Sequence, residues 1–129
     1  MTPATLFGIA LAPLYAAIAT VESDRGATDK NIYQIRRIYI DDVNRIVAPL
    51  GIKFDYGDVY SQQKSEEMMY YFWQYYGKSY QLETGKAPTA SILARMHNGG
   101  PRGWMKNCTK GYWNRVLAAL VQIQKEDAK

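Results

Sequence analysis

The sequence predicts a compact, mainly α-helical fold with a small β-hairpin, and two observations carry that prediction. Apolar residues recur every three or four positions in five segments of the chain, which is the periodicity of helices that bury one face. Proline and glycine residues fall between those segments, where they end helices and form turns. The 129 residues, 47% of them hydrophobic, are enough for one core, so we expect a single domain over residues 1–129.

The first predicted helix runs from Pro13, which suits a first helical turn, to Ser23. Its apolar stripe includes Tyr15 and Ile18, and helical geometry places Glu22, the first charged residue of the chain, beside them. The uncharged first 21 residues also resemble a signal peptide or a membrane anchor. Because this segment has no basic start and carries Pro13 in its middle, we expect it to belong to the mature fold.

A turn-rich loop and a second helix are expected next. Residues 24–34 have room for little more than a small hairpin. The helical rhythm resumes over residues 35–50, where Pro49 and Gly51 stop it. Residues 52–57 alternate in polarity like a short strand or an extended loop.

The longest predicted helix spans residues 61–82 and carries seven aromatic rings, too many for one buried face. The residues expected on its buried face are Met68, Met69, Phe72, Tyr76 and Tyr80. The other rings should lie at a surface or a cleft, either as platforms for sugars or as ordinary half-buried side chains. Shorter helices are expected over residues 88–97 and 112–124, the last followed by a charged tail.

The charge and the cysteine count exclude several classes of protein. The formal net charge of +4 is modest, and Arg36-Arg37 is the only adjacent basic pair, so a solvated surface is favoured over nucleic-acid binding. A single cysteine, Cys108, cannot form an intrachain disulfide, and with one histidine, His97, it gives no metal-binding spacing. We therefore expect no metal and no cofactor, and a thiol enzyme built on Cys108 and His97 matches no known signature.

Two short motifs carry a resemblance to a known family. The first is Glu22-Ser23 at a predicted helix end, followed by Tyr33-Gln34-Ile35, and the second is the segment HNGGP over residues 97–101. In this order and spacing they resemble the lysozyme superfamily, in particular soluble lytic transglycosylase-like domains and the lysozymes of phages and invertebrates. The resemblance spans roughly residues 14–116 and implies an α+β lysozyme-like fold, with the small β-hairpin beside the active-site cleft. Asn31 stands where the family has a glycine, and asparagine tolerates the same left-handed backbone.

The resemblance implies that Glu22 is the general acid of a glycosidase. Cleavage of a glycosidic bond needs a carboxyl group that keeps its proton near neutral pH, and apolar surroundings raise the pKa of a glutamate. The alternative for Glu22 is a surface ion pair with Arg25 or Arg95. A hydrolase usually needs a second carboxylate about 5–9.5 Å from the first. Asp29 is the best placed candidate, although aspartate is also common in turns.

The family's remaining functional positions map onto residues around these two motifs. The resemblance implies substrate binding by Tyr33, Gln34, His97, Asn98, Gly99 and Tyr112. Tyr33 and Gln34 would line the cleft opposite Glu22, and the glycines of the HNGGP segment would let the backbone approach the sugar. For His97 a structural role is the alternative.

The function implied is cleavage of peptidoglycan at the β-1,4 linkage between N-acetylmuramic acid and N-acetylglucosamine, by a muramidase or a lytic transglycosylase. The latter needs no second acid, since one glutamate acts first as acid and then as base. A chitin-directed glycosidase, a non-catalytic sugar-binding or structural module, and a small basic nucleic-acid binder are the alternatives.

The expected partners are the glycan strands of peptidoglycan. We expect no nucleic acid, no stable membrane insertion and a monomer. The chain should be made in the cytoplasm without a clear signal peptide and should act on the bacterial cell wall, as a phage lysis protein (an endolysin) or a virion component.

Overall fold

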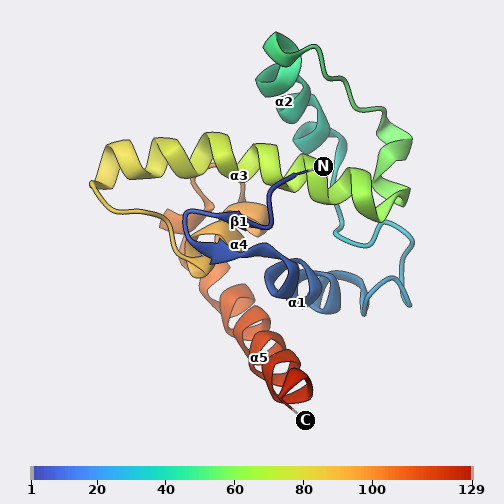
Figure 1. Ribbon diagram of the computed structural model, residues 1–129, viewed down its shortest axis with the longest axis vertical. Helices are drawn as coiled ribbons and strands as arrows, with labels where there is room; N and C mark the ends of the chain where they lie inside the picture. Colours follow the sequence, from blue (N-terminus) through green and yellow to red (C-terminus); the bar gives the residue numbers. More distant parts are fainter. Residues whose placement is uncertain (1, 129) are drawn as a thin grey trace.

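A computed structural model describes residues 2–128, which form five α-helices and a short β-hairpin around one core (Figure 1). The helices are α1 (Leu11–Ser23), α2 (Arg37–Val47), α3 (Gln62–Thr84), α4 (Ala90–Gly99) and α5 (Lys110–Asp127). In Figure 1, α2 lies on one side of the long helix α3 and α5 extends away on the other. Buried side chains from all five helices form one hydrophobic cluster. The prediction of a mainly helical fold with a small antiparallel sheet is confirmed.

The hairpin forms at the N-terminus and not in the loop over residues 24–34, which contains turns and no strand. Strand β1 (Thr5–Leu6) pairs antiparallel with β2 (Ile9–Ala10). Phe7 and Gly8 join the strands with positive φ angles of 51° and 77°, as a tight two-residue hairpin turn requires. The ring of Phe7 packs on Gly77 of α3, where an added Cβ would lie 2.4 Å from it. The hairpin therefore braces α3 and is not beside the cavity described below.

Helix α1 begins two residues before Pro13, which occupies its first turn. Its buried residues include Leu14 and Ile18, in agreement with the predicted apolar stripe. The helix ends at Ser23 and is capped by Asp24, which has a left-handed backbone (φ 51°) and whose amide bonds back to the last turn. The uncharged N-terminal segment thus contributes to the core, and no helix among residues 2–128 is long and apolar enough to cross a membrane.

The second predicted helix is shorter than its apolar pattern suggested. Helix α2 ends at Val47 and continues as a 3₁₀ turn over Ala48–Leu50, which contains Pro49 and is closed by Gly51. Residues 52–55 are extended without strand pairing, and Asp55 then caps a 3₁₀ helix over Tyr56–Tyr60 through a capping box. The alternating polarity of this stretch therefore reflects an extended loop.

Helix α3 starts after Ser61, whose hydroxyl accepts a hydrogen bond from the Lys64 amide. Three of the five residues predicted for its buried face, Met68, Met69 and Phe72, are buried, whereas Tyr76 and Tyr80 are half-buried. Two rings outside that prediction, Tyr70 and Trp73, are also buried. The indole N–H of Trp73 donates to the Leu93 carbonyl of α4 over 2.8 Å, which ties α3 to α4.

The chain after α4 turns back closely against α4 because a glycine lies at the contact. Thr89 caps α4, and the chain turns back through 3₁₀ turns over Gly103–Met105 and Asn107–Thr109 into α5. A Cβ at Gly103 would lie 2.2 Å from the Arg95 carbonyl oxygen, so only glycine fits this crossing. Helix α5 then packs along α1, which brings distant parts of the sequence to the end of α1.

Candidate active site

A cavity of about 870 Å³ opens where the C-terminal ends of α1 and α4 face α2. Its lining residues are Glu22 from α1, Gln34 and Arg36 from the following loop, Ile38, Tyr39, Asp41, Asp42 and Arg45 from α2, Phe72 from α3, and His97, Asn98, Gly100 and Pro101 from α4 and the turn after it. The cavity thus brings Glu22 and part of the HNGGP segment together across about 75 residues of sequence, as expected for a ligand site formed between helices.

Glu22 reaches the cavity because α1 ends directly after it. Ser23, the last helical residue, is buried, and its hydroxyl donates to the Ile32 carbonyl (2.7 Å) and accepts from the Gly26 amide (2.8 Å). These two bonds hold the loop over residues 24–32 against the helix end. The Glu-Ser pair therefore combines a carboxyl group at the cavity wall with a hydroxyl group that fixes the loop beside it.

The surroundings of Glu22 favour its protonated form. Its side chain is 18% exposed, and burial raises its pKa above the usual value for glutamate. The Tyr112 hydroxyl donates to Glu22 Oε2 over 3.1 Å, and this bond and the charges of Arg115 and Arg36 lower the pKa in part. The nearby C-terminal end of α1 also disfavours a negative charge.

The two arginines considered as ion-pair partners of Glu22 bond elsewhere. Arg25 donates from Nε to the Thr20 hydroxyl, and Arg95 donates from Nε to the Thr109 hydroxyl. Glu22 is thus a half-buried carboxyl group at a cavity, which is the setting that glycosidases use for a general acid.

His97 is buried beside Glu22, and burial lowers its pKa to about 4. Its Nε2 lies 2.8 Å from the Tyr33 carbonyl oxygen, so Nε2 carries the proton and donates to it. The same Nε2 lies 3.5 Å from Glu22 Oε2. Because the imidazole is neutral at pH 7, this approach is a weak polar contact and not an ion pair.

The wall opposite Glu22 comes from α2 and was not predicted from the sequence. Asp42 accepts from Arg45 over 2.8 Å and from the Tyr76 hydroxyl, and Asp41 accepts from the Tyr56 hydroxyl over 2.7 Å. A signal was available, because Ile38, Asp41, Asp42 and Arg45 are spaced three, four and seven residues apart and so share one face of a helix. From the sequence alone, that face is indistinguishable from an ordinary solvated helix surface.

Of the predicted site residues, Glu22, Gln34, His97 and Asn98 line this cavity. Asp29 does not. It is exposed in the loop after α1, and its carboxylate accepts from the Asn31 amide over 2.8 Å. That bond and one with Gln34 lower the pKa of Asp29. The structure therefore gives Asp29 the role of a turn residue.

Three other predicted residues contribute differently from what was expected. The ring of Tyr33 is buried and its hydroxyl donates to the Glu66 carboxylate (2.5 Å), so Tyr33 contacts the site through its carbonyl, which accepts from His97. Tyr112 is buried and contacts Glu22 without lining the cavity. Gly99 packs against Thr109, where a Cβ would lie 2.6 Å from the threonine methyl group.

The left-handed backbone expected at Asn31 occurs at Gln34 instead, with φ 52°. Asn31 clamps the loop through its side chain, which accepts from the Ile35 amide (3.0 Å) and donates to the Ile35 carbonyl (2.9 Å). The Gln34 side chain donates to the Asn31 carbonyl over 2.8 Å. Within residues 2–128, no three His, Cys, Asp or Glu side chains gather as a metal site.

The fold and the cavity define a helical protein with a half-buried carboxyl group in a cleft, and the chain has local sequence similarity to lysozymes. It is 44% identical over 45 residues to lysozyme 1 of Crassostrea virginica, which is 35% of this chain and 24% of that protein. It is 49% identical over 43 residues to a lysozyme of Meretrix lusoria, 33% of this chain and 35% of that protein.

A third similarity is 64% identity over 25 residues to invertebrate-type lysozyme 6 of Caenorhabditis elegans, 19% of this chain and 18% of that protein. The matches thus span about a third or less of the length of these curated relatives. No family model and no solved structure matches the chain.

Proposed function

We propose that the protein is a glycosidase that cleaves the glycan strands of peptidoglycan, with Glu22 as the general acid. The observation that carries this proposal is the position of Glu22, half-buried at a cavity with its pKa raised by burial. The local similarity to proteins named lysozyme supports the same activity. The site of action would be the bacterial cell wall.

In the proposed reaction, Glu22 transfers its proton to the glycosidic oxygen between N-acetylmuramic acid and N-acetylglucosamine. The bond from the anomeric carbon to that oxygen breaks, and its electron pair goes to the leaving oxygen. The positive charge that develops on the sugar ring is met by the Glu22 carboxylate formed in the same step. A hydroxyl group or water then attacks the anomeric carbon and returns a proton to Glu22.

The neighbouring residues have distinct proposed roles. Tyr112 orients the carboxyl group of Glu22 through its hydrogen bond to Oε2 (3.1 Å), and the neutral ring of His97 packs beside the same oxygen at 3.5 Å. Gln34 and Asn98 line the cavity and would offer amide groups to the N-acetyl groups of the sugar. The stacked rings of Tyr39 and Phe72 (4.3 Å between centroids) give the cavity an apolar floor against which a sugar ring could pack.

A lytic transglycosylase is the second candidate, and the positions of the aspartates favour it. Asp29 lies outside the cavity, and Asp41 and Asp42 accept hydrogen bonds from tyrosine or arginine side chains. In transglycosylation Glu22 alone suffices, because it takes the proton of the C6 hydroxyl group of the muramic residue as that oxygen closes an anhydro ring. In hydrolysis the attacking group is water.

Purified peptidoglycan treated with wild type and with Glu22→Gln tests the proposal. Wild type should release soluble fragments, and Glu22→Gln should lower the rate about 100-fold or more, since general acid catalysis contributes about 10²–10⁴-fold. Glu126→Gln, an exposed glutamate on α5, is the matched control. If Glu22→Gln retained activity, Glu22 would not be the general acid.

Mass spectrometry of the fragments separates the two reactions, since anhydro products are lighter by one water and lack a reducing end. Release of fragments from chitin alone would point to a chitin-directed enzyme. Binding of glycan without any cleavage would point to a non-catalytic module.

A further inference from the structure

We infer that a second hollow, next to the cavity that holds Glu22, binds more distant sugars of the same glycan strand. This inference rests on the proposed function and extends it to substrate length. The hollow has a volume of about 390 Å³ and lies between the C-terminal half of α3 and the turn over residues 101–104. Its walls are rich in aromatic rings, from Tyr75, Tyr76, Tyr80 and Trp104.

The two hollows are adjacent and share part of their walls. Arg45 and Pro101 line both of them. Tyr76, in the wall of the second hollow, also donates to Asp42 in the wall of the first. A linear ligand that leaves the Glu22 cavity past Arg45 and Pro101 would therefore enter the aromatic hollow.

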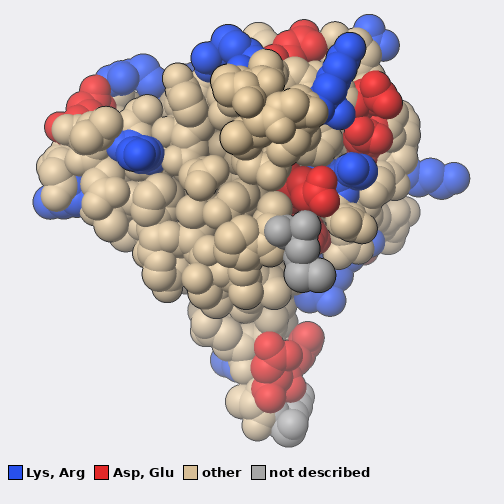
Figure 2. All heavy atoms as spheres, turned by 45° about the horizontal axis from the view of Figure 1, so that its top comes forward, with Lys and Arg blue, Asp and Glu red and all other residues tan. Residues whose placement is uncertain are grey.

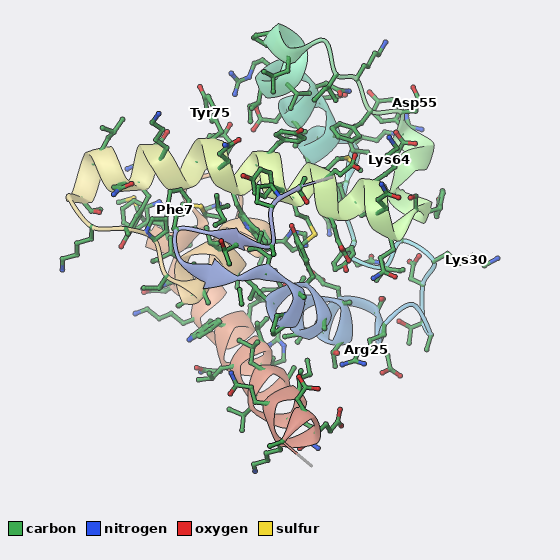
Figure 3. The ribbon with its side chains drawn as sticks, viewed as in Figure 1. Phe7, Arg25, Lys30, Asp55, Lys64 and Tyr75 are labelled. Atoms are coloured by element: carbon green, nitrogen blue, oxygen red, sulfur yellow. The ribbon has the colours of Figure 1, made fainter. Side chains whose placement is uncertain are left out.

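The guanidinium groups of Arg45 and Arg102 lie over the rings of Tyr75 and Trp104, at 5.5 and 5.9 Å from the ring centroids. A sugar would pack on the parts of these rings that the arginines leave open. Tyr80 and Trp104 meet edge to face, with 4.8 Å between centroids and 90° between planes, so each fixes the orientation of the other. Tyr75 is 44% exposed and projects from α3 on the side where α2 lies (Figure 3). Aromatic faces pack against the C–H face of a sugar, and their polar edges remain available for its hydroxyl groups.

The arginines of the second hollow are each paired with a carboxylate, so they do not form a basic patch of the kind that binds a phosphate polyanion. Arg45 is bound to Asp42 at 2.8 Å, and Arg102 to Glu83 at 3.1 Å. Each pair offers hydrogen-bond donors and acceptors to hydroxyl and acetamido groups without a net charge that would select a phosphate backbone. On the face seen in Figure 2, Lys and Arg are scattered around the margins and do not form one basic patch.

Binding of glycan fragments of defined length tests the inference. The fragments alternate N-acetylglucosamine and N-acetylmuramic acid, lack stem peptides, and contain two or six sugars. The full chain with Glu22→Gln serves as the parent, so that no fragment is cleaved during the measurement, and binding is followed by calorimetry. The parent should bind the six-sugar fragment more tightly than the two-sugar fragment.

Trp104→Ala and Tyr75→Ala, each added to the parent, should each weaken binding of the six-sugar fragment about 3- to 10-fold, the range for one aromatic contact. Trp104→Phe should retain most of the affinity because it keeps a ring. Tyr60→Ala is the matched control, since Tyr60 is 66% exposed and lines neither hollow. Tyr75 is exposed at the surface, so Tyr75→Ala keeps the test valid even if Trp104→Ala unfolds.

Two negative outcomes have different meanings. Six-sugar affinity that stays within twofold of the Tyr60→Ala control in both alanine variants would overturn this inference and leave the proposed function intact. If the folded parent binds neither fragment, the proposed function fails together with the inference.

Discussion

The hydroxyl of Tyr112 lies 3.1 Å from Oε2 of Glu22, across 90 residues of sequence. The contact exists because α5 packs along α1 and carries Tyr112 to the helix end at which Glu22 meets the cavity. The hydrogen bond favours the ionised carboxylate and so lowers a pKa that burial raises. Tyr112 therefore both orients the proposed general acid and limits how firmly it holds its proton.

Replacing Tyr112 by phenylalanine should shift the pH dependence of catalysis. Without the hydroxyl group the ionised form of Glu22 loses a donor, so its pKa rises further and the alkaline limb of the pH–rate profile moves to higher pH. The measurement is the rate of release of soluble peptidoglycan fragments as a function of pH. Tyr60→Phe is the control, and an alkaline limb that stays in place or moves to lower pH would contradict the role given to Tyr112.

His97 should make the protein less stable in acid. Its pKa is lowered from about 6.5 to about 4, so the unfolded chain binds the proton more tightly than the folded one. Stability from this group is complete above pH 6.5 and is lost as pH falls toward 4, by up to about 3 kcal/mol at about 1.4 kcal/mol per pKa unit. Urea unfolding of wild type between pH 4 and 7 measures this slope.

His97→Gln should flatten that slope, because an amide can still donate to the Tyr33 carbonyl and does not titrate. Glu22 also titrates beside His97 and changes stability with pH in the opposite direction. Because its pKa is raised by folding, its contribution to the free energy of unfolding decreases as pH rises. The protein with His97 and the His97→Gln variant are therefore compared in a background in which both carry Glu22→Gln. Parallel pH profiles with and without His97 would show that its burial does not control acid stability.

Asp29→Asn should leave catalysis nearly unchanged, within about threefold of wild type. The Asp29 carboxylate lies outside the cavity and accepts from the Asn31 amide, a bond that the side-chain oxygen of an asparagine can replace. The rate of fragment release and the urea midpoint are measured together, which separates a lost turn from a lost catalyst. A drop of 100-fold in rate with an unchanged midpoint would make Asp29 the second catalytic carboxylate.

Gly103→Ala should destabilise the fold by about 1–3 kcal/mol, the usual cost of overpacking. The added Cβ would lie 2.2 Å from the Arg95 carbonyl oxygen, which is backbone and cannot move aside without shifting α4. Gly57→Ala is the matched control, because a Cβ there meets nothing within 4 Å. Free energies of unfolding from urea titration measure both, and equal values for the two variants would contradict the close crossing at Gly103.

The sequence predicted the helices well because their apolar periodicity and their breakers lie within each segment. The end of α1 at Ser23, the cap at Ser61 and the turn after Gly99 all follow from local residues. The position of the hairpin could not be predicted in this way. Phe7-Gly8 is a two-residue turn with short flanking strands, and its stability depends on packing of Phe7 against Gly77 of α3.

The candidate site was predictable only where a motif marked it. Glu22 and the HNGGP segment were found by resemblance, and helical geometry alone placed Glu22 on the apolar stripe. The Asp41 and Asp42 wall was missed because polar residues at helical spacing are usual on any exposed helix face. Asp29 was chosen by its distance in sequence, and the path of the loop carries it out of the cavity.

Titration of the Glu22 carboxyl group by carbon NMR tests the central claim most directly, with the signal assigned by its absence in Glu22→Gln. The structure predicts a pKa above the ordinary glutamate value of 4.5, so that the group keeps a proton available to a leaving oxygen at higher pH than exposed glutamates do. A measured pKa at or below 4.5 would contradict the proposed general acid.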